Sequence, residues 1–323
     1  MNKPKGCFLG TAQAIGNAYA AAVRQKLSEK LDMTDADDPS VEYIFSTWGM
    51  PALTDEEIAA RFPKLKAVFY AAGSVQAFAR PFLQRGIRVF SAWGANGVPV
   101  AEYTVAQILL ANKGFFQTVH RGGSPVWTEH DCGKPYPGNY DTSVGIIGAG
   151  MIGKMVIGLL KNYRLQVKIF DAFVSDEKAA ALGAEKVSTL PELFAACPVV
   201  SNHLANNAQT KDMIDKQCFD NMAPNGVFIN TGRGQQVVEA DLIEALQAVP
   251  TRCAVLDVTN PEPPAAGSAL YTLPNVFLTP HCAGSIGNEV QRMGEYMVEE
   301  FTAFSEGRPT RYAVTEEMLR TMA

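Results

Sequence analysis

Three polar side chains that could take part in one reaction lie at or just past the ends of apolar, strand-like segments. These are Arg233, Glu262 and His281. A guanidinium binds a carboxylate through a fork of donors and polarises an adjacent oxygen. A histidine exchanges a proton near neutral pH, and a carboxylate beside it stabilises its charged form. The set suits hydride transfer at C2 of a 2-hydroxy or 2-keto acid.

Each of these residues also has a simpler explanation when it is taken alone. Arg233, in a loop before a helix, could be a solvated surface charge, and Glu262 stands between two prolines as exposed loop residues often do. His281, after Thr-Pro, could satisfy local backbone groups. The functional interpretation depends on their coincidence at strand ends, because open parallel sheets bind ligands beyond the carboxyl ends of their strands.

The segment 143–153 is a short apolar strand that runs into Gly-x-Gly-x-x-Gly and then into a helical pattern. Gly148 permits the tight turn, Gly150 lets backbone approach a pyrophosphate, and Gly153 lets helix and strand pack closely. The helix would begin at Met151 and Ile152 and offer free N–H groups to phosphate. Glycines alone would be weak support, but the strand, helix and following acid together predict a dinucleotide site.

Asp171 ends the next predicted strand, 165–170, where a carboxylate would accept hydrogen bonds from the adenosine ribose. A 2′-phosphate would meet its like charge, and residues 172–174 supply no cation to offset it. NAD is therefore the expected cofactor.

Strand-like and helix-like segments alternate along the chain, which predicts parallel α/β architecture. We expect early strands at 6–10, 43–46, 67–70 and 89–91, and early helices at 16–31, 55–61 and 81–84. A long helix is expected from about Val100 to His120, an irregular crossover over 121–141, and a second α/β series over 143–285. A last helix over 288–304 is long enough to return to the first domain. The cleft between two such domains would be the natural ligand site.

Composition limits the function classes. The chain has 323 residues, 47% hydrophobic residues and a net charge of −5, so we expect two globular domains without a nucleic-acid or anionic-membrane partner. Its six cysteines are scattered and include no Cys-x-x-Cys pair, which indicates reduced thiols in the cytoplasm and no metal site. We find no signal peptide or membrane-spanning run.

From about Leu65 to the last helix the chain resembles the D-isomer-specific 2-hydroxyacid dehydrogenases, which include phosphoglycerate, glyoxylate/hydroxypyruvate and D-lactate dehydrogenases. Four motifs in the family's order carry the resemblance: VGIIGAGMIG, NTGRG, DVTNPEP and LPNVFLTPHCAG. It implies two doubly wound parallel-sheet domains: a Rossmann NAD-binding domain at 106–287, inserted in a flavodoxin-like substrate domain at 1–105 and 288–323.

The resemblance also implies roles. Arg233 would bind the substrate carboxylate, His281 would be the acid/base and Glu262 its partner. In the first domain, Ala72, Gly73 and Ser74 resemble a loop whose N–H groups hold the substrate carboxylate. The remaining implied cofactor contacts are Thr104, Ala205, Thr210, Thr231, Gly232, Asp257, Ala283 and Gly284. His203, in the segment under the adenine, is expected to be structural.

The chain departs from the family pattern at several positions, and these departures bear on the residue roles that the resemblance implies. The family often has Leu-Pro-Leu-Thr where this chain has Leu-Ala-Asn-Asn at 204–207, and usually carries Asp or Asn near Val75. Glu262 argues against formate dehydrogenase, whose relatives have glutamine there. We expect no regulatory domain after the last helix, which would argue against a serine-regulated phosphoglycerate dehydrogenase.

Several alternatives stay open. The fold is shared by NAD-sensing corepressor-like scaffolds, which are the second hypothesis. Family members are usually dimers, so a homodimer using the arm 114–141, with Trp127, is expected. Trp48 and Trp93 could line a substrate pocket or belong to the core. A substrate phosphate could be bound by one of several first-domain cations, although a solvated helix face would also explain them: Arg61, Lys64, Lys66, Arg80, Arg85 and Arg88.

Overall fold

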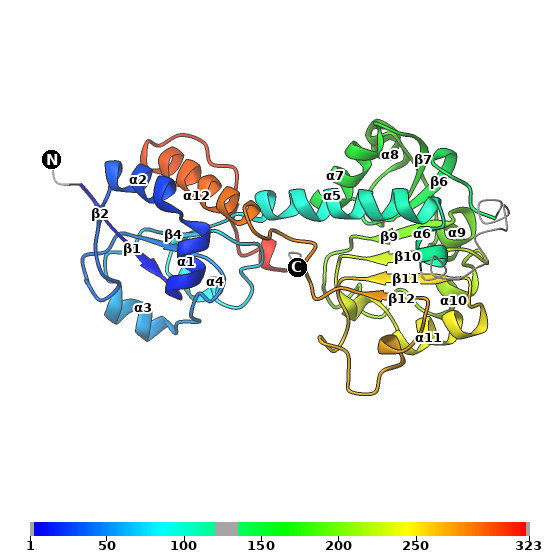
Figure 1. Ribbon diagram of the computed structural model, residues 1–323. Helices are drawn as coiled ribbons and strands as arrows, with labels where there is room; N and C mark the ends of the chain where they lie inside the picture. Colours follow the sequence, from blue (N-terminus) through cyan, green and yellow to red (C-terminus); the bar gives the residue numbers. More distant parts are fainter. Residues whose placement is uncertain (1–2, 120–134, 321–323) are drawn as a thin grey trace. The chain divides into compact units, whose positions relative to one another are not determined.

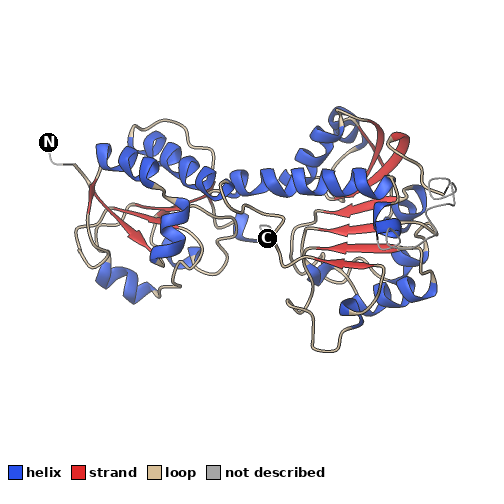
Figure 2. Cartoon of the chain, viewed as in Figure 1, coloured by secondary structure: helices blue, strands red, loops and turns tan. Residues whose placement is uncertain are grey.

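The computed structural model describes residues 3–119 and 135–320, which form two compact units. The first unit is Met1–Pro99 with Gly284–Ala323, and the second, Val100–Ala283, interrupts it in the sequence. In each unit, helices cover both faces of one sheet (Figures 1 and 2). The predicted pair of doubly wound parallel sheets, one inserted in the other, is therefore confirmed. The assignment of the NAD-binding domain to residues 106–287 stays a prediction.

The first unit contains a six-stranded sheet in the order β13-β5-β4-β3-β1-β2. Its first five strands are parallel and follow the flavodoxin-like order 2-1-3-4-5, while β13 joins β5 antiparallel. The strands are β1 (Lys5–Leu9), β2 (Asp32–Met33), β3 (Tyr43–Ser46), β4 (Ala67–Tyr70), β5 (Arg88–Ser91) and β13 (Ala313–Val314).

Both faces of this sheet are buried, which explains why its central strands are largely apolar. One face packs against α3 (Asp55–Arg61) and α4 (Ala79–Gln84). The other packs against α1 (Ala12–Ala18), α2 (Ala21–Lys30) and α12 (Glu289–Ser305). On that face Phe45, Phe69 and Phe90 stack across three strands, with ring centroids 5.2 Å and 4.8 Å apart, and Phe301 of α12 meets the first two edge-on.

The second unit contains a seven-stranded parallel sheet in the order β12-β11-β10-β9-β6-β7-β8. The six strands from β8 to β11 have the 3-2-1-4-5-6 order of a Rossmann fold, whose switch point lies between β6 and β9. The strands are β6 (Tyr140–Ile147), β7 (Arg164–Phe170), β8 (Ala184–Lys186), β9 (Val199–Asn202), β10 (Val227–Asn230), β11 (Cys253–Leu256) and β12 (Val276–Leu278).

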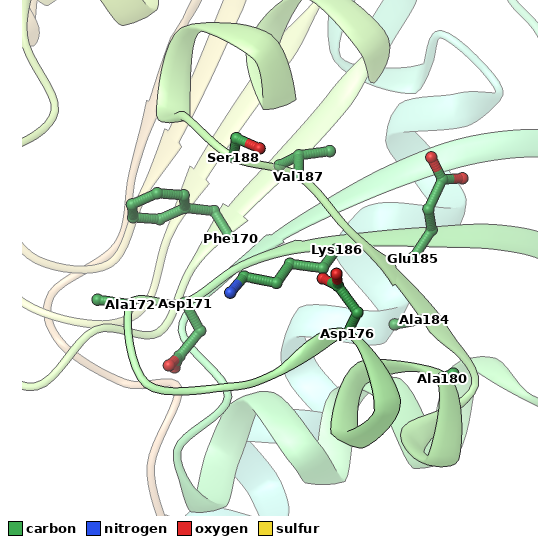
Figure 3. Close-up of a pocket in the computed structure, with 10 residues that line it drawn as sticks. All are labelled: Phe170, Asp171, Ala172, Asp176, Ala180, Ala184, Glu185, Lys186, Val187 and Ser188. Carbon is green, nitrogen blue, oxygen red and sulfur yellow. The ribbon is translucent and has the colours of Figure 1, made fainter.

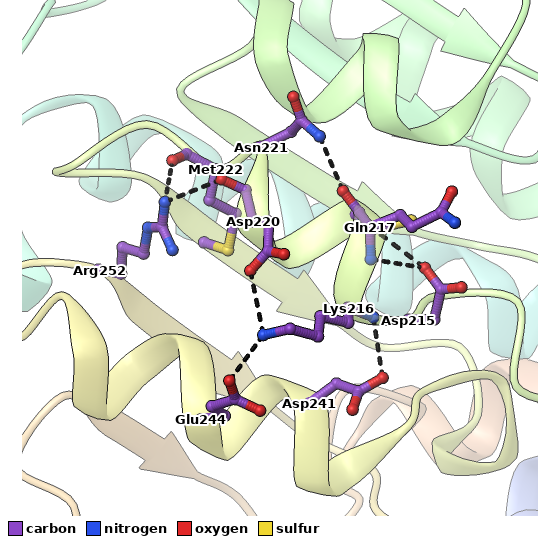
Figure 4. Close-up of polar contacts among 10 residues, drawn as sticks. Asp215, Lys216, Gln217, Asp220, Asn221, Met222, Asp241, Glu244 and Arg252 are labelled. Atoms are coloured by element: carbon purple, nitrogen blue, oxygen red, sulfur yellow. Dashed lines mark hydrogen bonds and ion pairs between the residues drawn. The ribbon is translucent and has the colours of Figure 1, made fainter.

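Helices α5 (Trp93–Asn112), α7 (Met151–Leu160) and α8 (Asp176–Leu182) cover one face of the second sheet. Helices α9 (Leu190–Ala196), α10 (Lys216–Asp220) and α11 (Glu239–Ala248) cover the other. Figure 4 shows how α10 is tied to α11: Lys216 Nζ lies 2.6 Å from Glu244 Oε1, and the Lys216 N–H donates to Asp241.

Two helix predictions were wrong. The helix expected at 16–31 is divided into α1 and α2, because the fully buried Tyr19 takes a non-helical conformation and its hydroxyl donates to the carbonyls of Ser46 and Phe69. The helix expected from Val100 begins at Trp93 instead and contains Pro99. Within residues 3–119 and 135–320, no helix is long and apolar enough to cross a membrane.

Much of the expected crossover and dimer arm, including Trp127, falls at 120–134, outside the described residues. Strand β6 begins at Tyr140, three residues before the start expected from the sequence.

Candidate active site

The glycine turn connects β6 to α7 at the switch point of the second sheet. Gly148 has φ +89°, a conformation that side chains other than glycine rarely adopt, and its N–H donates to the Phe170 carbonyl at 2.8 Å. A Cβ on Gly153 would collide with the Gly148 carbonyl oxygen. The close contact between turn and helix therefore requires glycine at both positions.

The start of α7 can receive a phosphate. Gly150 is its N-cap and has open space where a side chain would stand. Because the first N–H groups of a helix have no intrahelical acceptor, those of Met151 and Ile152 are available to an anion. These residues fit the pyrophosphate of NAD.

Asp171, which follows β7, closes this turn. One carboxylate oxygen accepts from the Ala149 N–H at 2.7 Å, and the other accepts from the N–H groups of Phe173 and Val174. The carboxylate thus fixes both the glycine turn and the loop after β7. A role toward the adenosine ribose stays a prediction.

Asp171 also lines a pocket of about 910 Å³ between the ends of β7 and β8 and helix α8 (Figure 3). Asp176 and Lys186 contribute opposite charges to its lining. The sequence showed no cation directly after Asp171, but the fold brings Lys186 to the same pocket from the next strand. Lys186 could not be predicted from the sequence, because fifteen positions separate it from Asp171 along the chain.

His203 lies beneath the glycine turn. Its backbone N–H donates to the Ile147 carbonyl at 2.8 Å, and its ring Nε2 is 3.0 Å from Ser201 Oγ. Nδ1 is buried and has no hydrogen-bond partner among the described residues. Burial lowers the pKa of His203 to about 4, so the ring is neutral in the folded protein near pH 7.

This histidine makes stability depend on pH. As the pH falls, the unfolded chain protonates His203 near its ordinary pKa of about 6.5, whereas the folded protein resists protonation down to about 4. Its contribution to stability is thus complete above about pH 6.5 and is lost toward pH 4. Between pH 7 and 5, the unfolding free energy should fall about 2 kcal/mol more for wild type than for His203→Gln. Urea titrations at both pH values test this, and equal losses would contradict it.

A buried amide network connects the ends of β9 and β10 to the short 3-10 turn that contains Gln236. Asn202 Nδ2 donates to Asn230 Oδ1 at 3.0 Å and to Gln236 Oε1 at 2.6 Å. Gln236 Nε2 donates to the carbonyls of Leu204 and Ala205, both at 2.9 Å. Asn230 in turn accepts from the Gly232 N–H and donates to the Arg233 carbonyl. The network therefore joins the loop after β9 to the loop that carries Arg233.

Removal of the Gln236 amide should be costly. Gln236→Leu would take one donor from each of the carbonyls of Leu204 and Ala205 and one acceptor from Asn202 Nδ2. The Ala205 carbonyl keeps Thr210 Oγ1 and Asn202 Nδ2 keeps Asn230 Oδ1, so the unfolding free energy should fall by about 1–3 kcal/mol. Gln235→Leu is the matched control, because that side chain is exposed and makes one exposed hydrogen bond, to Asn206. It should cost less than about 0.5 kcal/mol. Similar losses in denaturant titrations of the two variants would show that the network does not stabilise the fold.

The three candidate catalytic residues lie at the carboxyl ends of β10, β11 and β12. His281 Nδ1 is 2.6 Å from Glu262 Oε1, and the two side chains are 46% and 41% exposed. Arg233 donates from Nη1 to the Gly232 carbonyl at 2.7 Å. Burial lowers the Arg233 pKa and the charge of Glu262 opposes that shift, so the two residues lie within electrostatic reach. The predicted set is thus brought together in one unit.

Asp257 holds the turn that presents His281. His281 has φ +54°, and its backbone N–H donates to the backbone carbonyl of Asp257 at 3.0 Å. The Asp257 carboxylate accepts from the N–H groups of Cys282 and Ala283 and from the Thr279 hydroxyl. Asp257 therefore orients the histidine turn, a role that the motif did not reveal. A contact with the nicotinamide stays a prediction.

Other predicted cofactor residues in this unit support neighbouring loops. The hydroxyls of Thr104 and Thr231 lie 3.0 Å apart and link α5 to the loop after β10. Thr210 Oγ1 donates to the Ala205 carbonyl at 2.6 Å and accepts from the Asn207 N–H at 3.1 Å. The Asn207 side chain also accepts from two N–H groups of this loop. These bonds shape the segment where the chain departs from Leu-Pro-Leu-Thr.

The predicted substrate loop, Ala72–Ser74, belongs to the first unit. Ser91 Oγ donates to the Ala72 carbonyl at 2.9 Å, and Ser74 is exposed. Asn96 also lies here: its Oδ1 accepts from the Ser285 N–H, and its side chain would touch a Cβ on either Gly73 or Gly284. Asn96 is not among the residues that the motifs indicated, because no local pattern of the sequence places it beside this loop.

Known proteins share this sequence and fold. Residues 105–283, more than half of the chain, match the family model described as D-isomer specific 2-hydroxyacid dehydrogenase, NAD binding domain. D-3-phosphoglycerate dehydrogenase of Archaeoglobus fulgidus is 32% identical over 72% of the chain, and formate dehydrogenase of Chaetomium thermophilum is 29% identical over 85%. D-mandelate dehydrogenase of Rhodotorula graminis superposes with a TM-score of 0.82 at 21% identity, covering 97% of this chain and 98% of that one.

The matches differ in how much of each relative they cover. The chain spans 43% of the Archaeoglobus protein and 77% of the formate dehydrogenase. It thus matches less than half the length of the phosphoglycerate dehydrogenase.

Proposed function

Because the chain belongs to the D-isomer specific 2-hydroxyacid dehydrogenase family, as its motifs predicted, we propose that it transfers a hydride between NAD and C2 of a small D-2-hydroxy or 2-keto acid. The observation that carries this proposal is the 2.6 Å pair of His281 and Glu262, with Arg233 in its electrostatic reach. The family model describes an NAD-binding domain, which supports NAD as the cofactor.

The proposed chemistry follows from the orientation of the His281 ring. Because Nδ1 is engaged by Glu262, Nε2 is left to exchange a proton with the C2 oxygen. In reduction His281 donates that proton, and in oxidation it accepts one, while Glu262 stabilises the charged ring. Arg233 binds the carboxylate of the acid and polarises the C2 oxygen. Bound NAD supplies or accepts the hydride.

The remaining contacts belong to the same proposal. The first N–H groups of α7 would hold the pyrophosphate, Asp171 the adenosine ribose, and Ala72–Ser74 with Arg233 the substrate carboxylate. Further cofactor contacts would come from Thr104, Ala205, Thr210, Thr231, Gly232, Asp257, Ala283 and Gly284. Glu262 stands where formate dehydrogenases are expected to have glutamine, so formate is not the proposed substrate.

Location and assembly are also part of the proposal. Cys7, Cys197, Cys218, Cys253 and Cys282 are free thiols, which supports a cytoplasmic protein. The net charge of −5 argues against a nucleic-acid partner. A homodimer is proposed from the resemblance alone.

Loss of NADH absorbance at 340 nm tests the function, with glyoxylate, hydroxypyruvate and pyruvate as arms and NADPH as the alternative cofactor. Formate is tested in the opposite direction, by the gain of absorbance with NAD⁺. We expect turnover with NADH and a 2-keto acid, no gain with formate, and a product of D configuration from hydroxypyruvate or pyruvate by chiral chromatography. NADH binding without turnover of any keto acid would instead favour the NAD-sensing scaffold.

A further inference from the structure

The strand-end loops of the first unit carry no charged side chain. These loops follow β1, β3, β4 and β5 and comprise residues 10–11, 47–54, 71–78 and 92. They lie at the carboxyl edge of the parallel strands, the edge at which such sheets bind ligands. Two of the acidic residues after β2 are engaged elsewhere: Asp38 pairs with Lys5, and Asp37 lies 3.8 Å from Arg61.

Two of these loops start side by side. Ser46 is paired in register with Tyr70, so the loops after β3 and β4 leave neighbouring strands at the same level. Thr47 Oγ1 donates to the Ala71 carbonyl at 2.7 Å and holds the start of one loop to the other. The segment beginning at Trp48 therefore borders the Ala72–Ser74 loop.

Trp48, in the loop after β3, is a large hydrophobic residue that is nevertheless 43% exposed. Gly49 has φ +85°, and the Met50 N–H donates to the Thr47 carbonyl at 3.1 Å, so the segment makes a tight turn. Met50 packs against the core while Trp48 stays outside it. The turn thus places a large aromatic surface at the ligand edge of the sheet.

Apart from Arg80, the cations considered for a substrate phosphate are placed away from this edge or engaged. Lys66 pairs with Glu42 just before β4, and Arg88 begins β5, so both lie at the amino edge. Arg85, just before β5, pairs with Asp55. Arg80, exposed in the first turn of α4, is the candidate that follows the substrate loop most closely in sequence.

We propose that the substrate carries an uncharged, apolar substituent on C2, and that Trp48 contacts that substituent. The inference rests on the proposed function, which places the acid's carboxylate on Ala72–Ser74. A phosphate or second carboxylate would lose water at these loops without meeting a counter-charge, whereas an apolar group would cover exposed indole. The chain would then differ in substrate from the phosphoglycerate dehydrogenase to which it is similar.

Steady-state kinetics with NADH test the proposal on the full chain. The apolar arms are 4-methyl-2-oxopentanoate and phenylglyoxylate, the charged arms are 3-phosphohydroxypyruvate and oxaloacetate, and glyoxylate has no substituent. We expect kcat/KM for the better apolar acid to exceed that of both charged acids by at least about tenfold. Trp48→Ala should lower it by roughly 10–100-fold and leave glyoxylate within about threefold, and Trp48→Phe should restore most of the loss.

The outcomes separate the two proposals. Preference for a charged acid, especially one abolished by Arg80→Ala, would overturn the apolar substituent but leave the dehydrogenase function standing. Equal losses with glyoxylate and the apolar acids in Trp48→Ala would overturn the contact with Trp48. Absence of turnover with every acid, glyoxylate included, would overturn the proposed function and this inference with it.

Discussion

We expect Arg233→Ala to lower kcat/KM for the best 2-keto acid by roughly 10²–10⁴-fold. The guanidinium would bind the substrate carboxylate and polarise the reacting oxygen, and its partial burial strengthens both interactions. Alanine removes the charge and the fork of donors together. Steady-state rates of NADH oxidation measure the loss.

Two matched variants show whether the loss is specific. Arg233→Lys keeps the charge without the planar fork, so its kcat/KM should fall between those of wild type and alanine. Arg164→Ala removes an exposed arginine of the same unit, paired with Asp141, and should leave kcat/KM unchanged. NADH affinity, measured by fluorescence titration, should stay near wild type for Arg233→Ala. Wild-type kcat/KM in that variant would refute the proposed role.

His281→Gln should lower kcat by roughly 10²–10⁴-fold, because glutamine can hold the C2 oxygen by a hydrogen bond but cannot exchange a proton with it. NADH binding should change little. The single-turnover rate of NADH oxidation, measured by stopped flow, isolates this step from product release.

Glu262→Gln provides the test of coupling. Its side chain has the same shape without the charge that stabilises the protonated ring, so kcat should fall by a smaller factor. Since Glu262 is proposed to act through His281, the double variant should be no slower than His281→Gln alone. Multiplying losses in the double variant would mean that the 2.6 Å pair does not act as a unit.

The parts of the fold that follow from local pattern could be predicted from the sequence. Strands at 43–46 and 67–70 and the helix at 55–61 lie where the apolar and helical patterns of the sequence place them. The break between α1 and α2 could not be predicted, because no glycine or proline marks it. It depends on two carbonyls, 27 and 50 residues away, that Tyr19 reaches through its hydroxyl.

The candidate site also has one part that could be predicted from the sequence and another that could not. The residues that carry motifs, Arg233, Glu262 and His281, could be named from the sequence because strand ends of a parallel sheet meet at one edge. The residues that support them could not be named, because Asn202 meets Asn230 and Gln236 only after β9 and β10 have paired. The role of Asp257 in shaping the histidine turn likewise depends on backbone N–H groups that no sequence pattern displays.

The insertion of the second unit into the first has a consequence for synthesis on the ribosome. The stack of Phe45, Phe69 and Phe90 belongs to the first 99 residues, but Met293, Met297 and Phe301, which cover it, emerge only after the whole second unit. The second unit is continuous and can fold as it emerges, whereas the first must wait about ten seconds or more at ordinary elongation rates with its aromatic face covered only by α1 and α2. During that interval the nascent amino-terminal segment is the part of the chain that most needs a chaperone.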